Sequence, residues 1–335
     1  MGVDKAARER AAWLRAELAR HDRLYYLESR PEISDAEYDR LFKELKELES
    51  AHPELVTSDS PTQRVGAPLP EGQGFEKVAH SVPMLSIDSL FDAEEVREFE
   101  EKIRRFLKTP AGEVFAWSVE PKFDGVSIAL YYEHGRFVRG LTRGDGEVGE
   151  DVTANLRTVR NLPLVLDGTQ RPLPAQLEVR GEVLMRRDAF QRFNQARAAR
   201  DEPALANPRN ATSGAVRRND PAEVARYPLE FQAWAVAQVT GVDFSTHAES
   251  LRALREWGIP VSELGRTVRG LEEALLYHDE LEAQRFVVPF DMDGIVAKLG
   301  DLRLRERLGT TSRSTRWQYA HKFAPIEATS QLRAI

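Results

Sequence analysis

Apolar residues change their spacing near residue 70, and no other feature constrains the fold as strongly. Before that point they recur at helical intervals, for example at Leu14 and Leu18 and again at Leu41 and Leu45. After it they often alternate with polar residues, as expected of half-buried strands. The sequence therefore predicts a helical unit at the N-terminus, followed by a larger unit built around β-sheets.

Two helices are expected in the first unit. Ser34 and Glu37 have the spacing of a capping box, which predicts that the second helix begins there. The turn-rich segment HPELVTSDSPTQRVGAPLPEGQG follows it and indicates a domain boundary. We therefore expect residues 1–69 to form a helical subdomain and residues 70–335 to form the main domain.

The main domain mixes strand and helix patterns. A hairpin is predicted around His134 and Gly135, where alternating segments meet. The segments QLEVRGEVLM, LEFQAWAVAQV, FDMDGIVAKLG and RWQYAHKFA are further strand candidates. Helices are expected around residues 92–107, 187–198, 247–257 and 270–284. Because strands and helices do not alternate regularly, the predicted class is α+β rather than a doubly wound sheet.

Composition excludes several classes of protein. The 335 residues have no apolar run that could span a bilayer and no secretory signal, so we expect a cytoplasmic protein. With no cysteine, neither a disulfide nor a cysteine-ligated zinc site can form. The net charge of −7 restricts nucleic-acid binding to a local patch. Residues 186–226 offer one, with nine arginines against five acids, although a solvated helix and loop is the default interpretation.

Common catalytic signatures are weak or missing. GDGEVG, residues 144–149, matches G-x-G-x-x-G, but its acids would repel a pyrophosphate and the preceding segments form a hairpin. A glycine-rich turn that caps a helix starting near Glu150 is the better interpretation. The sequence contains no G-x-x-x-x-G-K-[ST], H-E-x-x-H or G-x-S-x-G, and its seven histidines lack ligand spacing.

Three lysines lie within otherwise apolar strand segments, at Lys122, Lys298 and Lys322. Charges in such places are costly unless the face is wet or functional. If the three converge, they form a cationic cleft suited to a polyphosphate. A free lysine, with a pKa near ~10.4, is a poor nucleophile at neutral pH, and neighbouring cations with partial burial favour the neutral amine. Lysines beside an acid therefore suggest phosphoryl or nucleotidyl transfer.

The order of four motifs resembles a known superfamily. A K-x-D-G match such as KFDG arises by chance in about one chain in ten of this length. Here LEVRGEV, FDMDGIVAKL and AHKF follow it in the order seen in covalent nucleotidyltransferases, which include ligases and capping enzymes. PEISDAEYDRLFKELKELE, VPMLSID, TRGDGEVGEDVTANLRT and ANPRNATSGAVR narrow the resemblance to bacterial NAD-dependent DNA ligases, over residues 12–325.

This resemblance implies both a fold and a reaction. The fold would be an α+β, ATP-grasp-like ligase core of antiparallel sheets with flanking helices, preceded by a helical subdomain that binds nicotinamide mononucleotide (NMN). In the reaction, a lysine attacks the adenylyl phosphorus of NAD and releases NMN. The AMP then passes to the 5′-phosphate of a DNA nick, and the 3′-hydroxyl displaces it. NAD is a substrate here, Mg²⁺ is expected as cofactor, and the protein is expected to be monomeric.

The resemblance also assigns residues by position. Lys122 would be the nucleophile, Asp124 would orient it, and Lys322 would offset developing charge. The positions expected to hold the nucleotide are Ser86, Ile87, Asp88, Glu120, Arg143, Glu182 and Lys298. Asp293 and Glu182 are the expected metal ligands. Arg209, Arg217 and Arg285 match arginines that handle phosphate or DNA.

The NMN site is expected in the helical subdomain, at Tyr25, Tyr26, Asp35, Tyr38 and Asp39. Asp35, Tyr38 and Asp39 share one helix face, where an aromatic ring could stack on nicotinamide and acids could hold ribose hydroxyls. A structural alternative is a helix start whose acids favour the helix dipole and whose Tyr38 is core. Tyr26 stands where many relatives carry histidine.

Relatives of this kind continue past KFP into oligonucleotide-binding, zinc, helix-hairpin-helix and BRCT domains. Without counterparts here, the chain is expected to self-adenylate but to seal nicks poorly. Two rival functions remain open. An ATP- or GTP-using relative such as a capping enzyme would have no nicotinamide site, and a non-catalytic nucleic-acid-binding protein would form no covalent adduct.

Overall fold

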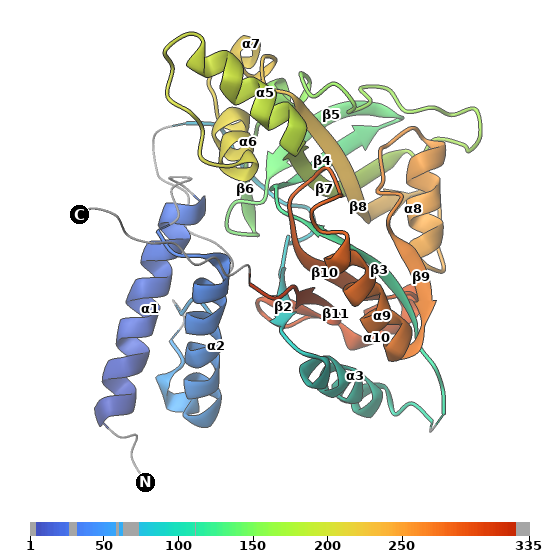
Figure 1. Ribbon diagram of the computed structural model, residues 1–335. Helices are drawn as coiled ribbons and strands as arrows, with labels where there is room; N and C mark the ends of the chain where they lie inside the picture. The colour runs from blue at the N-terminus through green and yellow to red at the C-terminus, as the bar shows by residue number, and fades with distance from the viewer. Residues whose placement is uncertain (1–4, 27–31, 58–59, 63–73, 111, 326–335) are drawn as a thin grey trace.

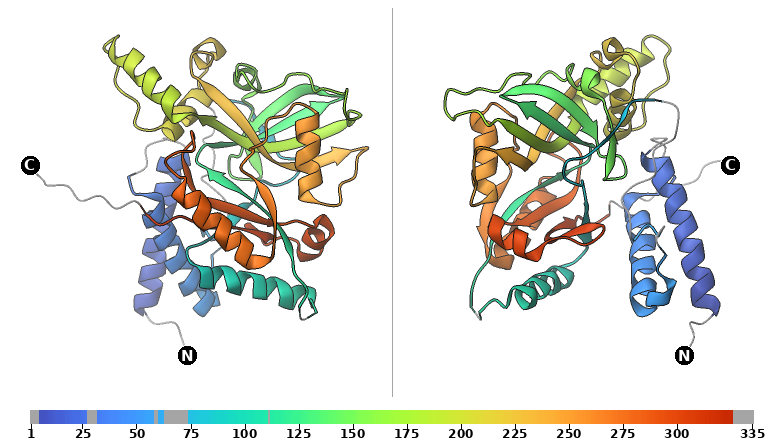
Figure 2. Two further views of the ribbon diagram at one scale, coloured as in Figure 1. Left: turned by 45° about the vertical axis from the view of Figure 1, so that its right-hand side comes forward. Right: turned by 180° about the vertical axis from the view of Figure 1, so that it is seen from behind.

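The computed structural model describes residues 5–26, 32–57, 60–62, 74–110 and 112–325. The predicted domain boundary near residue 70 lies outside these ranges. Within them, no helix is both long and apolar enough to cross a membrane. Figures 1 and 2 show a pair of helices packed along one side of a larger body of sheets and helices.

The N-terminal pair is formed by α1 (Lys5–Tyr26) and α2 (Asp35–Ala51), followed by the short 3-10 helix η1 (Pro53–Leu55). The predicted capping box is confirmed, because the Ser34 and Glu37 side chains each bond to the other's backbone N–H. Leu14, Leu18 and Leu45 are fully buried between the two helices. The helical spacing seen in the sequence therefore makes a small core of its own.

Within the described residues, the main domain contains three sheets. Strands of the five-stranded sheet, in spatial order, are β2 (Ser86–Leu90), β11 (Ser314–Lys322), β10 (Met292–Leu299), β3 (Ala116–Phe123) and β9 (Arg266–Arg269). Those of the four-stranded sheet are β5 (Arg136–Thr142), β4 (Val126–Glu133), β7 (Gln176–Met185) and β8 (Leu229–Thr240). A small pair joins β1 (Lys77–Ala79) to β6 (Val148–Glu150).

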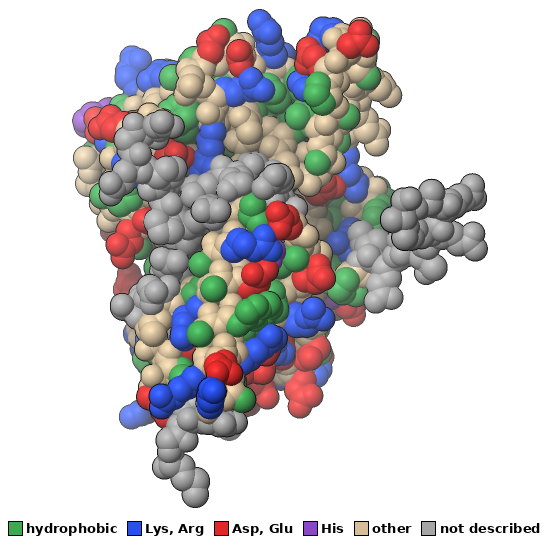
Figure 3. Space-filling view, turned by 90° about the vertical axis from the view of Figure 1, so that its left-hand side faces the viewer, with side chains coloured by type: hydrophobic (Ala, Val, Ile, Leu, Met, Phe, Trp, Pro, Cys, Tyr) green, Lys and Arg blue, Asp and Glu red, His purple; other side chains and the backbone are tan. Residues whose placement is uncertain are grey.

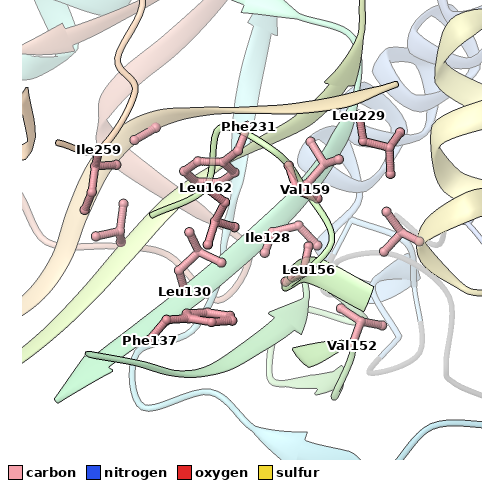
Figure 4. Close-up of a cluster of buried hydrophobic side chains, with 14 of the residues drawn as sticks. Ile128, Leu130, Phe137, Val152, Leu156, Val159, Leu162, Leu229, Phe231 and Ile259 are labelled. Carbon is pink, nitrogen blue, oxygen red and sulfur yellow. The ribbon is translucent and has the colours of Figure 1, made fainter. Parts of the chain in front are cut away.

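The remaining helices flank these sheets, as an α+β fold requires. They are α3 (Ala93–Leu107), α4 (Thr153–Leu156), α5 (Arg187–Ala198), α6 (Pro208–Val216), α7 (Pro221–Val224), α8 (His247–Glu256), α9 (Gly270–Ala283) and α10 (Leu302–Leu308). Helices α3, α9 and α10 pack on the five-stranded sheet around Trp117, which is fully buried. A second core, with Ile128, Leu130 and Phe231, lies against the four-stranded sheet (Figure 4).

Two sequence expectations need correction. The sheets are not wholly antiparallel, because β2 pairs with β11 in parallel. More than 200 residues separate these strands, so the long crossover that parallel pairing requires is available. The helix expected near Glu150 begins three residues later than that position. Glu150 ends β6, where it pairs with Lys77, and the four-residue helix α4 begins at Thr153.

Several turns contain glycines with positive φ, a conformation that glycine adopts at little cost. His134 and Gly135 both have positive φ, 47° and 75°, as a tight hairpin between β4 and β5 requires, so that prediction is confirmed. In GDGEVG, Gly144 and Gly146 also have positive φ, and this loop leads into β6. In the described stretch from β5 to α4, no strand–turn–helix unit of the dinucleotide-binding type forms around it.

Candidate active site

A cavity of about 1270 Å³ lies between the helical pair and the two larger sheets. Side chains from α2, β2, β3, β7, β10 and β11 line it, together with the ends of neighbouring elements. Sites enclosed by two structural units are typical places for small-molecule binding. Figure 3 views the molecule from the side of the helical pair, whose outer face carries charges of both signs interspersed.

Strand register brings two of the predicted lysines together. Lys122 on β3 and Lys322 on β11 are both paired with Gly294 of β10, from opposite sides. Residues directly opposite in neighbouring strands project from the same face. Gly294 also permits the close approach of β11, because a Cβ there would lie 2.3 Å from the backbone oxygen of His321.

Asp293 bridges these two lysines. Its Oδ2 lies 3.0 Å from Lys122 Nζ and 2.9 Å from Lys322 Nζ. A β-bulge between Met292 and Gly294 interrupts the register at this point, and bulges often re-aim side chains beside functional sites. Burial would raise the pKa of Asp293, but the two ammonium groups outweigh it and lower that pKa to about 2.

A carboxylate from the helical pair also contacts the lysine cluster. Lys322 Nζ also lies 3.2 Å from Asp39 Oδ2 of α2. Burial raises the pKa of Asp39 despite the attraction of Lys322. One ammonium group therefore joins a carboxylate of the sheet to a carboxylate of the helical pair.

The third lysine lines the same cavity but has a separate partner. Lys298 is 2% exposed, and its ammonium group donates to the Glu120 carboxylate and, at 2.7 Å, to the carbonyl oxygen of Trp234. Burial lowers the pKa of Lys298, and the pKa of Glu120 is held below its usual value against burial by Lys298 and His247. The expected convergence is therefore confirmed for the cavity, whereas only Lys122 and Lys322 share one carboxylate.

The side chains along β3 are spaced so that a nucleotide could lie across them. Glu120 and Lys122 are two residues apart on this strand, so they face the same side about 7 Å apart. Beside Glu120, the Trp234 ring lines the cavity, with Lys298 Nζ 4.8 Å from its centroid. Ammonium groups suited to phosphates thus stand at one end, and an aromatic face with a hydrogen-bond acceptor stands at the other.

Glu182 and its neighbours form another wall. Ser127 Oγ donates to Glu182 Oε1 at 2.9 Å, and Arg143 also lines this part of the cavity. Burial raises the pKa of Glu182 to about 7, against the hydrogen bond from Ser127 and the attraction of Lys122 and the nearby arginines. This carboxyl group can therefore exchange a proton near neutral pH.

Two predicted arginines are held by acids at the cavity. Arg209 Nε lies 2.9 Å from Asp124 Oδ1, and Arg217 Nε lies 2.9 Å from Glu150 Oε2. Arg285 differs, since it is not among the lining residues. Its Nη1 donates to the carbonyl oxygen of Ala324 at 3.0 Å, and its guanidinium stacks over Phe323.

The helical pair meets the main domain through several contacts. Lys46 Nζ lies 3.3 Å from Asp88 Oδ2, and Lys43 pairs with Glu95. The Arg313 guanidinium stacks 3.7 Å from the centroid of the Phe42 ring. These contacts draw α2 against β2, α3 and the start of β11, and so enclose the cavity.

Predicted residues of the NMN site are only partly described. Tyr38 and Asp39 line the cavity, and the Tyr38 hydroxyl donates to Asp22 Oδ1 at 2.6 Å. The side chains of Tyr25, Tyr26 and Asp35 lie outside the described residues. On the opposite wall, Ser86, Ile87 and Asp88 of β2 line the cavity as expected.

Sequence reasoning missed several lining residues. Trp234 and Gln232 enter from β8, and Asp22 enters from α1. Gln232 and Trp234 alternate with buried residues in LEFQAWAVAQV, which places both on one face of that strand. An aromatic and an amide side chain on one strand face were the sequence signal that could have identified these two lining residues.

The oxygen atoms present suit Mg²⁺. Asp293 Oδ1 and Glu182 Oε2 are buried and, among the described residues, accept no hydrogen bond. Mg²⁺ commonly takes one or two carboxylates together with substrate phosphates. The described residues contain no group of three or more histidine, cysteine or acidic side chains that could hold a metal alone. The donor set therefore fits a magnesium ion that enters with a phosphate.

Comparison with known proteins gives a consistent family. The model of the NAD-dependent DNA ligase adenylation domain matches residues 72–326, and that of the DNA ligase-like, N-terminal NAD+-binding domain matches residues 4–66. A DNA ligase of Geobacter metallireducens is 47% identical over 331 residues, which is 98% of this chain and 49% of the relative. One of Trichlorobacter lovleyi is 47% identical over 99% of this chain and 48% of the relative.

Among solved structures, an archaeal ATP-dependent RNA ligase matches with a TM-score of 0.39 and 14% identity, over 72% of this chain and 48% of that one, a likeness too weak to argue from. The chain spans about half the length of the curated relatives it matches. On the strength of the two family matches and these identities, the chain belongs to the NAD-dependent DNA ligases.

Proposed function

We propose that the chain performs the adenylation step of an NAD-dependent DNA ligase, with Lys122 as nucleophile. The observation that supports this most directly is the placement of Lys122 and Lys322 on one oxygen of Asp293, at the wall of a cavity that the helical pair encloses. A lysine nucleophile, a second ammonium group and a carboxylate are the groups that transfer of an adenylyl phosphate requires.

The step balances as follows. The Lys122 ammonium group loses one proton to water, and the free amine attacks the adenylyl phosphorus. The N–P bond forms while the P–O bond to NMN breaks, NMN leaves with its phosphate, and the nitrogen gives up a second proton. Lys322 stands where it can offset charge on the phosphate oxygens.

Mg²⁺, held by Asp293 and Glu182 together with the substrate phosphates, would supply further charge stabilisation when bound. Asp293 also keeps the two lysine ammonium groups close to each other despite their repulsion. Its lowered pKa keeps it ionised in this role throughout the neutral range.

Each of the two parts of the chain would bind one half of the dinucleotide. Residues 1–69 would hold NMN through Tyr38 and Asp39, with Tyr25, Tyr26 and Asp35 expected beside them. Residues 70–335 would hold the adenylyl half, through Glu120, Lys298 and the other predicted residues of the main domain. The support is that side chains from both parts line one cavity, and that Lys322 contacts Asp39.

In the whole protein, AMP would move from Lys122 to the 5′-phosphate of a nick in double-stranded DNA, and the 3′-hydroxyl would then displace it. Arg209 and Arg217 would contact phosphate, and the support is that both line the cavity, beside Asp124 and Glu150. Arg285 lies outside the cavity, so a role for it would be on DNA rather than on the nucleotide.

Intact-mass measurement tests the proposal. After incubation with NAD and Mg²⁺, the folded chain should gain one adenylyl group, and Lys122→Ala should gain none. Lys5→Ala is the matched control, because the Lys5 side chain is 88% exposed and does not line the cavity, and it should react like the parent. Adduct formation with ATP in preference to NAD would support the capping-type alternative. No adduct with any nucleotide would sink the proposal.

A further inference from the structure

Two buried side chains behind the site have no part in the steps above. His247, the first residue of α8, is 1% exposed, and Arg305 of α10 is 8% exposed. Neither is among the residues that line the cavity. Any effect they have on a bound nucleotide must therefore pass through another side chain, and both stand next to Glu120 and Lys298.

Arg305, His247 and the Glu120 carboxylate stand in line, and His247 Nε2, which is buried and makes no hydrogen bond within the described residues, faces Glu120. Arg305 Nη1 lies 3.4 Å from His247 Nδ1, and His247 Nε2 lies 3.8 Å from Glu120 Oε2. A guanidinium only donates hydrogen bonds, so Nδ1 must accept and the ring proton is assigned to Nε2, facing Glu120. Burial, with repulsion from Arg305 and Lys298, lowers the pKa of His247 to about 3, so the ring is neutral near pH 7.

Backbone contacts fix both residues to the end of β10. His247 N donates to the carbonyl oxygen of Gly300 at 2.9 Å, and Arg305 Nε donates to that of Leu299. These carbonyl groups directly follow Lys298, whose ammonium group binds Glu120 Oε1. One carboxylate oxygen of Glu120 is thus held by Lys298, and the other faces His247.

We propose that His247 is a positioning residue, which holds Glu120 as an acceptor-only group for the nucleotide base and so favours a purine with an exocyclic amino group over one with an oxo group. The inference rests on the proposed function, and it places the base at the end of the cavity lined by Glu120 and Trp234. A carboxylate accepts from an N–H but repels a carbonyl oxygen. Sites built to accept a hydrogen bond reject analogues that lack the donor.

The test compares NAD with nicotinamide hypoxanthine dinucleotide, whose purine carries an oxo group, in single-turnover adenylation. His247→Leu removes the imidazole that lies between Arg305 and Glu120 at similar side-chain volume, and His247→Gln can still accept from Arg305 and donate to Glu120. The leucine variant should raise the half-saturating NAD concentration about tenfold, with a smaller change in maximal rate, and should reduce the preference for NAD. The glutamine variant should recover most of both.

Ser250→Ala is the matched control. Ser250 is 3% exposed on the same helix, and its hydroxyl donates to the His247 carbonyl oxygen, so its loss reports local damage to α8 without removing the imidazole that faces Glu120. It should change neither quantity. Arg305→Gln, which changes the side chain one step farther from Glu120, replaces His247→Leu if thermal unfolding shows that variant to be unfolded.

Binding of AMP and of inosine monophosphate, measured by calorimetry on the same variants, needs no reaction and separates the two proposals. A folded chain that forms no adduct but binds AMP better than inosine monophosphate, in a His247-dependent way, would overturn the proposed function alone. The inference is overturned if folded His247→Leu keeps the parent's affinity and preference. Equal defects in the leucine and glutamine variants, or no preference in the parent, would overturn it too.

Discussion

Glu182 shows how burial and charge compete at a single residue. Its carboxyl group is held by Ser127 and attracted by Lys122, yet loss of water contact prevails and raises its pKa to about 7 from an ordinary value of 4.5. A group that changes its protonation near neutral pH at a cavity wall is a strong functional candidate. Because the pKa of Glu182 differs between the folded and unfolded states, it also makes the unfolding free energy depend on pH.

Glu182→Gln should stabilise the protein increasingly as pH rises from about 4.5 to 7. In this window the folded state keeps the Glu182 proton and the unfolded state releases it, so ionising conditions favour unfolding. A shift of this size corresponds to at most about 3 kcal/mol at pH 8. Urea denaturation of both proteins at pH 5 and pH 8 measures it. An equal difference in unfolding free energy at the two pH values would contradict the assignment.

At the scale of elements, the site depends on how closely β11 approaches β10. Gly294 is paired with Lys122 and Lys322 on its two sides, and the β10 bulge allows Asp293 to reach both ammonium groups. The cluster of Lys122, Lys322 and Asp293 is thus a property of strand register, so a change that separates the strands should disperse it.

Gly294→Ala should lower the unfolding free energy by several kcal/mol, within the large-effect range for point changes, because the new Cβ would meet the His321 backbone oxygen at 2.3 Å. Adenylation should fall with it, as Lys322 moves from Asp293. Gly214→Ala in α6 is the control, since a Cβ there meets nothing within 4 Å, and it should stabilise the helix by about 0.5–1 kcal/mol. Denaturant unfolding and intact mass measure both effects. Equal stabilities for the two variants would refute the argument.

For the whole molecule, the key contact is that between the helical pair and the main domain. Lys43–Glu95, Lys46–Asp88 and Lys322–Asp39 cross this junction, together with the stacking of Arg313 on Phe42. Ion pairs of this kind contribute about 0.2–1 kcal/mol each and weaken with salt. Closure over the dinucleotide should therefore be reversible and sensitive to ionic strength, as gating of an active site requires.

Charge reversal tests this docking. Lys43→Glu should raise the half-saturating NAD concentration about two- to fivefold at low salt. The reason is that it puts a negative charge at position 43 opposite the negative charge of Glu95, across the junction. The double change Lys43→Glu with Glu95→Lys should restore it, which separates the pair's effect from that of net charge. Added salt should reduce the defect. If the double variant is as impaired as the single one, the pair does not support docking.

Much of this architecture was predictable from local patterns. Helical periodicity before residue 52, the Ser34–Glu37 capping box, the His134–Gly135 hairpin and the strand QLEVRGEVLM all depend on neighbours within a few residues, and the structure confirms them. The parallel pairing of β2 with β11 and the pairing of β6 with β1, after which α4 begins only at Thr153, were not predictable in this way. Both depend on partners far away in the chain.

The site divides along the same line. Sequence alone determined which residue types were available, and motif order with family resemblance singled out Lys122, Glu120, Lys298 and Lys322. Only the tertiary structure decided that Lys122 and Lys322 share Asp293, while Lys298 is neutralised by Glu120. It alone revealed Trp234 at the cavity and His247 behind it. The reason is that burial and pairing set the cost and the partner of a charge, and both arise from contacts that the linear order of residues does not contain.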